Sequence, residues 1–166
     1  HERYGATVFM QEPNIKEGCG GLRDYHNLLW ISFVWRGLRT TRELADEGVM
    51  TPDERKQIER AVDFLVRARN EMHFLAGRPN DHLTLPIQGR VAGGLGYHQR
   101  PPVRRVESFM RDYYLAASDI FFLTNACARR MADSQASQKR GWFPFLSAGS
   151  EKTERVDGFL IRGGEI

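Results

Sequence analysis

The stretch TPDERKQIERAVDFLVRARNEMHFLAG, residues 51–77, decides the fold. Thr51 can cap a helix, Pro52 suits its first turn, and Glu54 completes a capping box. Gly77 is the residue type that commonly ends a helix. Apolar side chains recur between these ends at the helical period: Ile58, Ala61, Val62, Leu65, Ala68, Met72, Leu75 and Ala76. Such a helix is roughly 39 Å long and needs partners along its apolar stripe, so the sequence predicts a helical bundle.

A second long helix is expected from Pro101 to about Met131 or beyond, again with an apolar stripe at the helical period. Two shorter helices are expected over residues 40–47 and 88–95, the first ended by Gly48 and the second by a group of glycines. Two aromatic pairs of the second long helix are expected in the core: Tyr113-Tyr114 and Phe121-Phe122.

A further helix is expected over residues 22–38, with apolar side chains on more than one side. One stripe begins at Leu22 and follows the helical period, and large side chains such as Trp30 and Trp35 fill the other side. A helix that is apolar all round is buried. We therefore expect this helix to be covered on nearly all sides, with both tryptophans in the core.

The two ends of the chain differ in pattern from the helices. Residues 6–11 are short, apolar and β-branched, which predicts a strand. The helical domain is expected over residues 16–133. The polar stretch 134–154 predicts a linker or mobile loop. Residues 155–166 predict a strand leading to a missing downstream region. The expected fold is an all-α bundle of four or five helices, two of them long, with short strand fragments at its N- and C-terminal ends. Because the sequence starts with His1 rather than methionine, we expect a piece cut from a longer protein.

The composition is that of an ordinary globular protein. Of the 166 residues, 41% are hydrophobic. The sequence contains no run of 18 apolar residues, the length that a helix needs to cross a membrane. The 24 basic residues are interspersed with 21 acidic ones, which favours a salt-bridged surface over a nucleic-acid interface. Cys19 and Cys127 have no metal-ligand spacing and indicate a reducing compartment, so we expect a cytoplasmic protein.

Motifs that carry chemistry by themselves are missing from the sequence. There is no GxxxxGK[ST] phosphate loop, no HExxH, no Asp-x-Asp pair and no GxSxG elbow. The five histidines have no ligand spacing. We therefore expect neither catalytic residues nor metal ligands in this chain, and we expect the chain alone to be inactive.

One segment favours ligand binding: KEGCGGLRD, residues 16–24. A glycine-rich turn that leads into a helix presents backbone N–H groups at the positive end of the helix dipole, which suits a phosphate group. The cations Lys16 and Arg23 flank the turn. Asp24 either caps the helix or helps to hold a divalent cation beside phosphates. The pattern alone leaves a phosphate site and a purely structural turn both open.

Residues 16–24, followed by Leu28-Leu29-Trp30, resemble the signature of the protein-PII uridylyltransferase (uridylyl-removing enzyme) family. The similarity continues downstream in the same order, through residues 64–69, 73–78, Asp81, Leu83, Gln88, 95–97, Phe109-Met110, Tyr113-Tyr114 and 156–159. One departure lies inside the signature, because Cys19 stands where the family usually has proline.

The resemblance implies a multidomain bacterial enzyme of nitrogen regulation that uses Mg²⁺ and transfers UMP from UTP to a PII signalling protein. This chain would be the helical domain that follows the nucleotidyltransferase domain, with residues 1–15 as the tail end of that upstream domain. The family's catalytic carboxylates would lie upstream of His1, so none maps onto this sequence. The implied partners are the upstream nucleotidyltransferase domain and PII, with no membrane and no nucleic acid.

The resemblance also places the glycine-rich segment near the nucleotide, where the two domains meet. The residues expected to contact the nucleotide are Lys16, Gly18, Gly20, Gly21, Arg23 and Asp24. Arg67, Arg69 and His73 either pair with acidic residues of the fold or contact the nucleotide or PII. Two other functions stay open: a related adenylyltransferase that acts on glutamine synthetase, and a non-catalytic helical interaction module.

Overall fold

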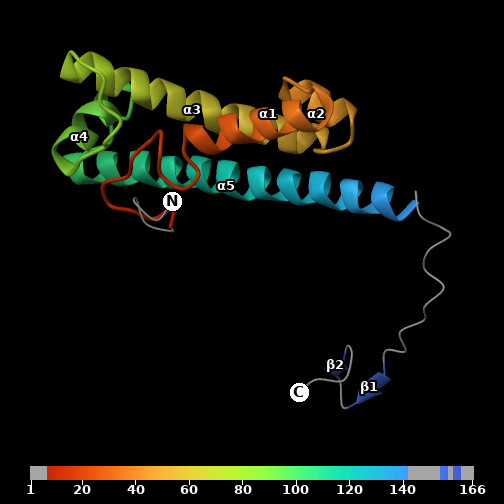
Figure 1. Cartoon of the computed structure of the whole chain (residues 1–166). Coiled ribbons are helices and arrows are strands. Elements are labelled where there is room, and N and C mark those ends of the chain that lie inside the picture. The colour runs from red at the N-terminus through yellow and green to blue at the C-terminus, as the bar shows by residue number, and fades with distance from the viewer. Residues whose placement is uncertain (1–6, 142–153, 157–158, 162–166) are drawn as a thin grey trace. The chain divides into compact units, whose positions relative to one another are not determined.

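The computed structural model describes residues 7–141, 154–156 and 159–161, and the side chains of residues 7–135. This part of the chain contains five α-helices, which confirms the predicted all-α class. Their bounds are α1 Leu22–Arg36, α2 Thr41–Asp46, α3 Pro52–Ala76, α4 Leu85–Gly94 and α5 Pro102–Gly141 (Figure 1). None of these helices is long and apolar enough to cross a membrane. The chain divides into two compact units, residues 1–131 and 132–166.

Helix α3 begins and ends where the sequence predicts. The Thr51 hydroxyl accepts a hydrogen bond from the Glu54 N–H at 3.1 Å, and the Glu54 carboxylate accepts one from the Thr51 N–H at 2.7 Å. A second capping box starts α2. Gly77 ends α3 with a φ of 60°. The caps satisfy amides that have no acceptor inside the helix, so these helix ends are specified locally.

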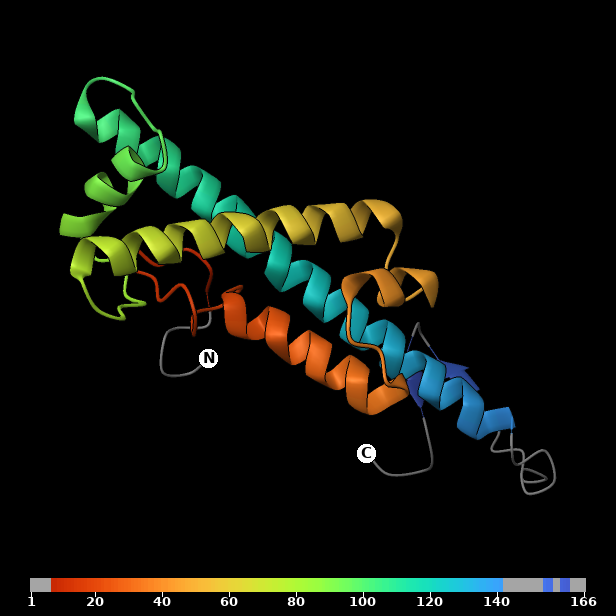
Figure 2. The same ribbon diagram turned by 90° about the horizontal axis from the view of Figure 1, so that it is seen from above.

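The two long helices frame the first unit. Helix α3 runs in the opposite direction to α5 and crosses it, and α1 lies alongside both (Figures 1 and 2). Gln57 Nε2 donates to Asp119 Oδ1 at 2.7 Å, and two nitrogens of Arg130 donate to Glu54, each at 2.8 Å. Large side chains from three helices fill the core between them: Leu28, Ile58, Leu65, Met72, Phe109, Tyr113 and Ile120.

Helix α1 is not buried nearly all round, so that prediction is wrong. Leu28 is buried, but Trp30 is 68% exposed and Val34 is 86% exposed. Trp35 is partly buried against the core, so only one of the two tryptophans contacts it. Within the first unit, α1 packs on one side only. The apolar pattern of a helix predicts that its sides are covered, but it does not show whether the covering residues belong to the same stretch of chain. We call Trp30, Ile31 and Val34 the outer face of α1.

Helix α5 starts at Pro102 as predicted and extends past Met131 into the stretch predicted as a linker. It continues to Gly141, so residues 134–141 are helical and not linker. This stretch contains no proline, and no glycine before its last residue, and alanine, glutamine, lysine and arginine favour helix. The remainder of the predicted linker, residues 142–153, lies outside the described residues. Phe122 is exposed. The prediction that the pair Phe121-Phe122 lies in the core is therefore wrong for Phe122.

The predicted N-terminal strand is not formed over residues 7–11, and residue 6 lies outside the described part. Side chains bind the backbone there instead. The Tyr114 hydroxyl donates to the Met10 carbonyl at 3.0 Å, and the Gln88 amide donates to the Gln11 carbonyl at 2.7 Å. These carbonyls therefore need no neighbouring strand.

At the other end of the chain, the single strand predicted from residue 155 is corrected to two. Strands β1, Glu154–Val156, and β2, Phe159–Ile161, pair with each other in antiparallel register. The residue types between them, Asp157 and Gly158, are typical of two-residue hairpin turns. The placement of those two residues lies outside the described part.

The contact between Glu54 and Arg130 makes the stability of the bundle sensitive to acid. Hydrogen bonds from Arg130 lower the pKa of Glu54 to about 2, from an ordinary value of 4.5. A carboxylate with a depressed pKa contributes stability above its unfolded value and loses it as the pH falls through the folded value. We expect Glu54→Gln to lower the free energy of unfolding by about 2 kcal/mol near neutral pH, and by much less near pH 2.

Urea unfolding followed by circular dichroism across this pH range measures that difference. Glu43→Gln is the matched control, because Glu43 caps α2 in the same way and no arginine of the described chain pairs with it. Its deficit near neutral pH should be smaller, because no bond to a guanidinium is lost. A Glu54→Gln deficit that stays the same in acid would contradict the prediction.

Candidate functional site

The glycine-rich segment folds into a turn whose backbone is bonded within itself. Oδ1 of Asn14 accepts hydrogen bonds from the N–H groups of Lys16 at 3.0 Å and Glu17 at 2.7 Å. The Asn14 carbonyl accepts from the Gly18 N–H at 2.9 Å. The sequence analysis did not single out Asn14. The signal that could have found it is an asparagine that starts a turn and bonds the backbone two residues on, the Asx-turn pattern.

The amides at the start of α1 find acceptors in the same way. Three backbone hydrogen bonds of 2.9–3.0 Å join the turn to the helix: Gly21 to Gly18, Leu22 to Ile15 and Arg23 to Lys16. The Gly20 N–H donates to Oδ2 of Asp24 at 2.8 Å. Because these amides are bonded inside the protein, they are not presented to a phosphate group, which favours the structural turn of the two possibilities that the sequence left open. Any phosphate contact at this turn therefore depends on its side chains.

Asp24 is buried in the first turn of α1, and its carboxylate binds the Gly20 N–H just before the helix. Burial raises the pKa of Asp24, and the hydrogen bond from the Gly20 N–H opposes that rise. One oxygen of its carboxylate is thus committed to the turn. Among the residues that the structure describes, no three His, Cys, Asp or Glu side chains come together to hold a metal ion. The contact that the structure gives Asp24 is a structural one, as an acceptor for the turn.

Close packing accounts for the three glycines of the turn. A Cβ atom added to Gly18 or Gly21 would lie 2.7 Å or 2.8 Å from the nearest carbonyl oxygen. Gly20 has a φ of 70°, which favours glycine, and a Cβ atom there would overlap the carbonyl oxygen of Ala117 on α5. The turn thus sits directly on the backbone of α5, and its glycines are explained without a ligand.

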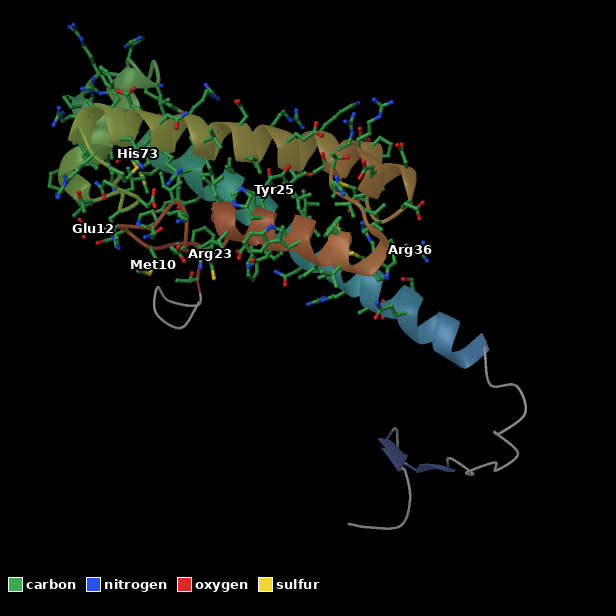
Figure 3. The ribbon with its side chains drawn as sticks, turned by 45° about the horizontal axis from the view of Figure 1, so that its top comes forward. Met10, Glu12, Arg23, Tyr25, Arg36 and His73 are labelled. Atoms are coloured by element: carbon green, nitrogen blue, oxygen red, sulfur yellow. The ribbon has the colours of Figure 1, made fainter. Side chains whose placement is uncertain are left out.

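Two cations remain at the surface of this turn. The side chains of Lys16 and Arg23 are 42% and 51% exposed. Oε1 of Glu17 lies between them, 2.6 Å from Arg23 Nη2 and 3.9 Å from Lys16 Nζ. Two cations and one carboxylate leave a local charge of +1. Figure 3 shows Arg23 at the start of α1, on the same side as Met10, and Arg36 at the far end of the helix.

A carboxylate joins α3 to the turn. Oδ1 of Asp81 accepts a hydrogen bond from Arg69 Nε at 2.6 Å and lies 3.3 Å from His73 Nε2. Burial raises the pKa of Asp81, but the hydrogen bonds and charges of these two partners outweigh it and hold the pKa below its ordinary value. The Asp81 carbonyl accepts from the Ile15 N–H at 2.9 Å. This ionic cluster therefore positions the glycine turn from the side of α3.

The three residues predicted on α3 do not form one group. Arg69 and His73 meet at Asp81, which supports the interpretation that they pair within the fold. Arg67 pairs with Asp63 at 2.9 Å, four residues earlier in the helix, and both side chains are more than half exposed. Asp81 is part of the family resemblance, but its role in joining α3 to the turn could not be predicted from the sequence.

The comparisons with known proteins agree on one family. A family model described as GlnD PII-uridylyltransferase matches residues 1–127. A bifunctional uridylyltransferase/uridylyl-removing enzyme of Bradyrhizobium sp. (strain BTAi1) is 40% identical over 137 residues, which are 82% of this chain and 15% of that protein. Proteins of the same description from Erythrobacter litoralis and Rhodospirillum rubrum are each 36% identical over the whole chain, which spans 18% and 17% of their lengths. The chain thus spans less than a fifth of these relatives, and no solved structure matches it significantly.

Proposed function

Because the chain belongs to the GlnD PII-uridylyltransferase family, we propose that it is a helical domain of a uridylyltransferase and contributes to the binding of UTP and of the acceptor protein. The whole enzyme would transfer UMP from UTP to a PII signalling protein in nitrogen regulation. In this proposal residues 16–133 are the helical domain and residues 1–15 end an upstream nucleotidyltransferase domain. In this proposal the carboxylates that hold Mg²⁺ belong to that upstream domain.

The observation that carries the nucleotide role is the exposed pair of cations, Lys16 and Arg23, on a turn that is held from two sides. Gly20 seats the turn on α5, and Asp81 holds it from α3. The backbone of the turn thus holds an ammonium and a guanidinium near each other, and together they can stabilise the negative charge of a triphosphate once it displaces the Glu17 carboxylate. Since the amides of the turn are bonded internally, these two side chains are the groups that would contact the nucleotide.

The outer face of α1 supports the proposed contact with another domain of the same polypeptide. Trp30, Ile31 and Val34 form a run of large apolar side chains on one helix, and all three are at least half exposed. Ile31 also lines a groove of about 180 Å³ between α1 and α5, together with Phe121 and Asn125. Exposed apolar patches of this kind are typical of interaction surfaces. The matched relatives are more than five times as long as this chain and have further residues that could cover it.

The nucleotide role is tested by Arg23→Gln in the full-length uridylyltransferase. We expect the KM for UTP to rise about tenfold, because the loss of one hydrogen bond to a charged group costs about 1.4 kcal/mol or more. The melting temperature should change little, since the Arg23–Glu17 pair is half exposed and such pairs add little stability. Steady-state kinetics with UTP varied and PII in excess measure the first quantity, and thermal unfolding measures the second.

Arg36→Gln is the matched control. Arg36 also lies on α1 and pairs with a glutamate, Glu47, at 2.9 Å, but at the opposite end of the helix. Its KM for UTP should equal that of the wild type. Equal UTP kinetics for Arg23→Gln would sink the nucleotide role and favour a non-catalytic interaction module. Use of ATP in place of UTP would favour an adenylyltransferase instead.

A further inference from the structure

A second cationic site lies at the turn between α4 and α5, away from the glycine turn in sequence and without a residue in common. A cavity of about 440 Å³ opens there. Its lining consists of two arginines, one histidine, one glutamine and two prolines: His98, Gln99, Arg100, Pro101, Pro102 and Arg105. No carboxylate lines it. The volume is within the range of about 300–1,000 Å³ that small-molecule sites occupy.

Arg105 is the half-buried member of this lining. Its Nε atom is buried and has no hydrogen-bond acceptor among the described residues. The guanidinium lies against the C-terminal part of α4, where its Nη1 would be 3.5 Å from a Cβ atom placed on Gly93. A buried N–H of a charged group without an acceptor is unfavourable. An anion in the cavity would provide the acceptor that the protein does not.

The positive charge of the cavity is not balanced by ion pairs. Among the described residues of the first unit, seven other arginines pair with acidic side chains: Arg23, Arg36, Arg55, Arg67, Arg69, Arg111 and Arg130. Within the described chain no such pair is formed by Arg100 or Arg105, or by Arg104 beside them. Pro101 and Pro102 have no N–H to offer, and the permanently charged donors of the lining are the two guanidinium groups, beside the polar side chains of His98 and Gln99. The planar fork of a guanidinium matches the oxygens of a phosphate group.

We propose that the α4–α5 cavity binds a small phosphorylated molecule of nucleotide size, with Arg100 and Arg105 as its phosphate ligands. The phosphate supplies the acceptor for Arg105 Nε and balances the unpaired charge. The volume exceeds that of a lone phosphate group, and the two proline rings give the remainder of the molecule an apolar wall.

Isothermal titration calorimetry on the whole 166-residue chain tests this site, with inorganic pyrophosphate and adenosine monophosphate as separate probes. We expect saturable binding of at least one probe, and stronger binding of the nucleotide if the cavity accepts more than a phosphate group. Arg105→Gln and Arg100→Gln should each weaken it about tenfold, the size expected for one lost hydrogen bond to a charged group. The second variant matters because Arg100 is exposed and its replacement leaves the packing unchanged.

Two arginines outside the cavity serve as controls. Arg42→Gln removes an exposed arginine of α2 and should not weaken this binding. Arg23→Gln removes one cation of the glycine turn and shows whether a probe binds at that turn instead. Absence of saturable binding would overturn the proposal. Equal weakening by Arg42→Gln would also overturn it, because the probes would then respond to the overall positive charge of the chain and not to the cavity. Binding lost in Arg23→Gln but kept in Arg105→Gln and Arg100→Gln would also overturn it, and would leave the proposed role of the glycine turn intact.

Discussion

Replacing Gly20 by alanine is expected to destabilise the chain by about 3 kcal/mol or more. The residue has a φ of 70°, which costs a side chain about 1–2 kcal/mol. A Cβ atom would also overlap the carbonyl oxygen of Ala117. That oxygen belongs to the backbone of α5 and cannot rotate away, so the turn has to move off the helix.

Gly48→Ala separates the two costs. Gly48 has a nearly identical φ of 72°, but a Cβ atom there meets nothing within 4 Å. We expect this variant to lose only the conformational part, about 1 kcal/mol. Urea unfolding of both variants gives the difference, which measures how tightly the turn is seated on α5. Equal losses would show that the turn can shift from Ala117 at no cost.

Asp81→Ala is expected to lower the free energy of unfolding by about 2 kcal/mol, because it leaves two half-buried basic side chains without their acceptor. Asp81 binds Arg69 and His73, and all three side chains are less than one-third exposed. The same residue holds Ile15 through its carbonyl. Amide hydrogen exchange at Ile15 should therefore accelerate together with the loss of stability.

Asp63→Ala is the control for this variant. Asp63 is also an aspartate that pairs with an arginine of α3, but both members of that pair are more than half exposed. Exposed pairs contribute about 0–1 kcal/mol, so the cost should be small and exchange at Ile15 should not change. Similar losses from the two aspartates would show that Asp81 is only another surface pair.

The helices could be predicted from the sequence because their limits are local. Thr51, Glu54 and Gly77 lie within a few residues of the helix ends that they specify, and each acts through a bond or backbone angle of its own segment. The end of α5 could not be predicted because polar residues such as Gln135 and Lys139 are compatible with both a linker and an exposed helix.

The burial of α1 and the chemistry of the glycine turn depend on distant parts of the chain. Trp30 has an apolar side chain wherever it lies, and its exposure follows from how many neighbours the fold supplies. The pattern of residues 16–24 correctly indicates a tight turn before a helix. It could not show that Asp24 and the carbonyl of Ile15 use the amides, because that depends on how the turn closes.

Glu17 gives the surface of the turn a built-in competitor. Its carboxylate already occupies the space between Lys16 and Arg23, so an incoming anion has to displace a tethered one. A singly charged ion gains little from that exchange, whereas a polyphosphate brings more charge than it displaces. On the proposed function, Glu17 would therefore lower the affinity of the two cations for every anion. It would lower the affinity for singly charged ions such as chloride and bicarbonate more than the affinity for a polyphosphate, so the turn would be selective for the polyphosphate.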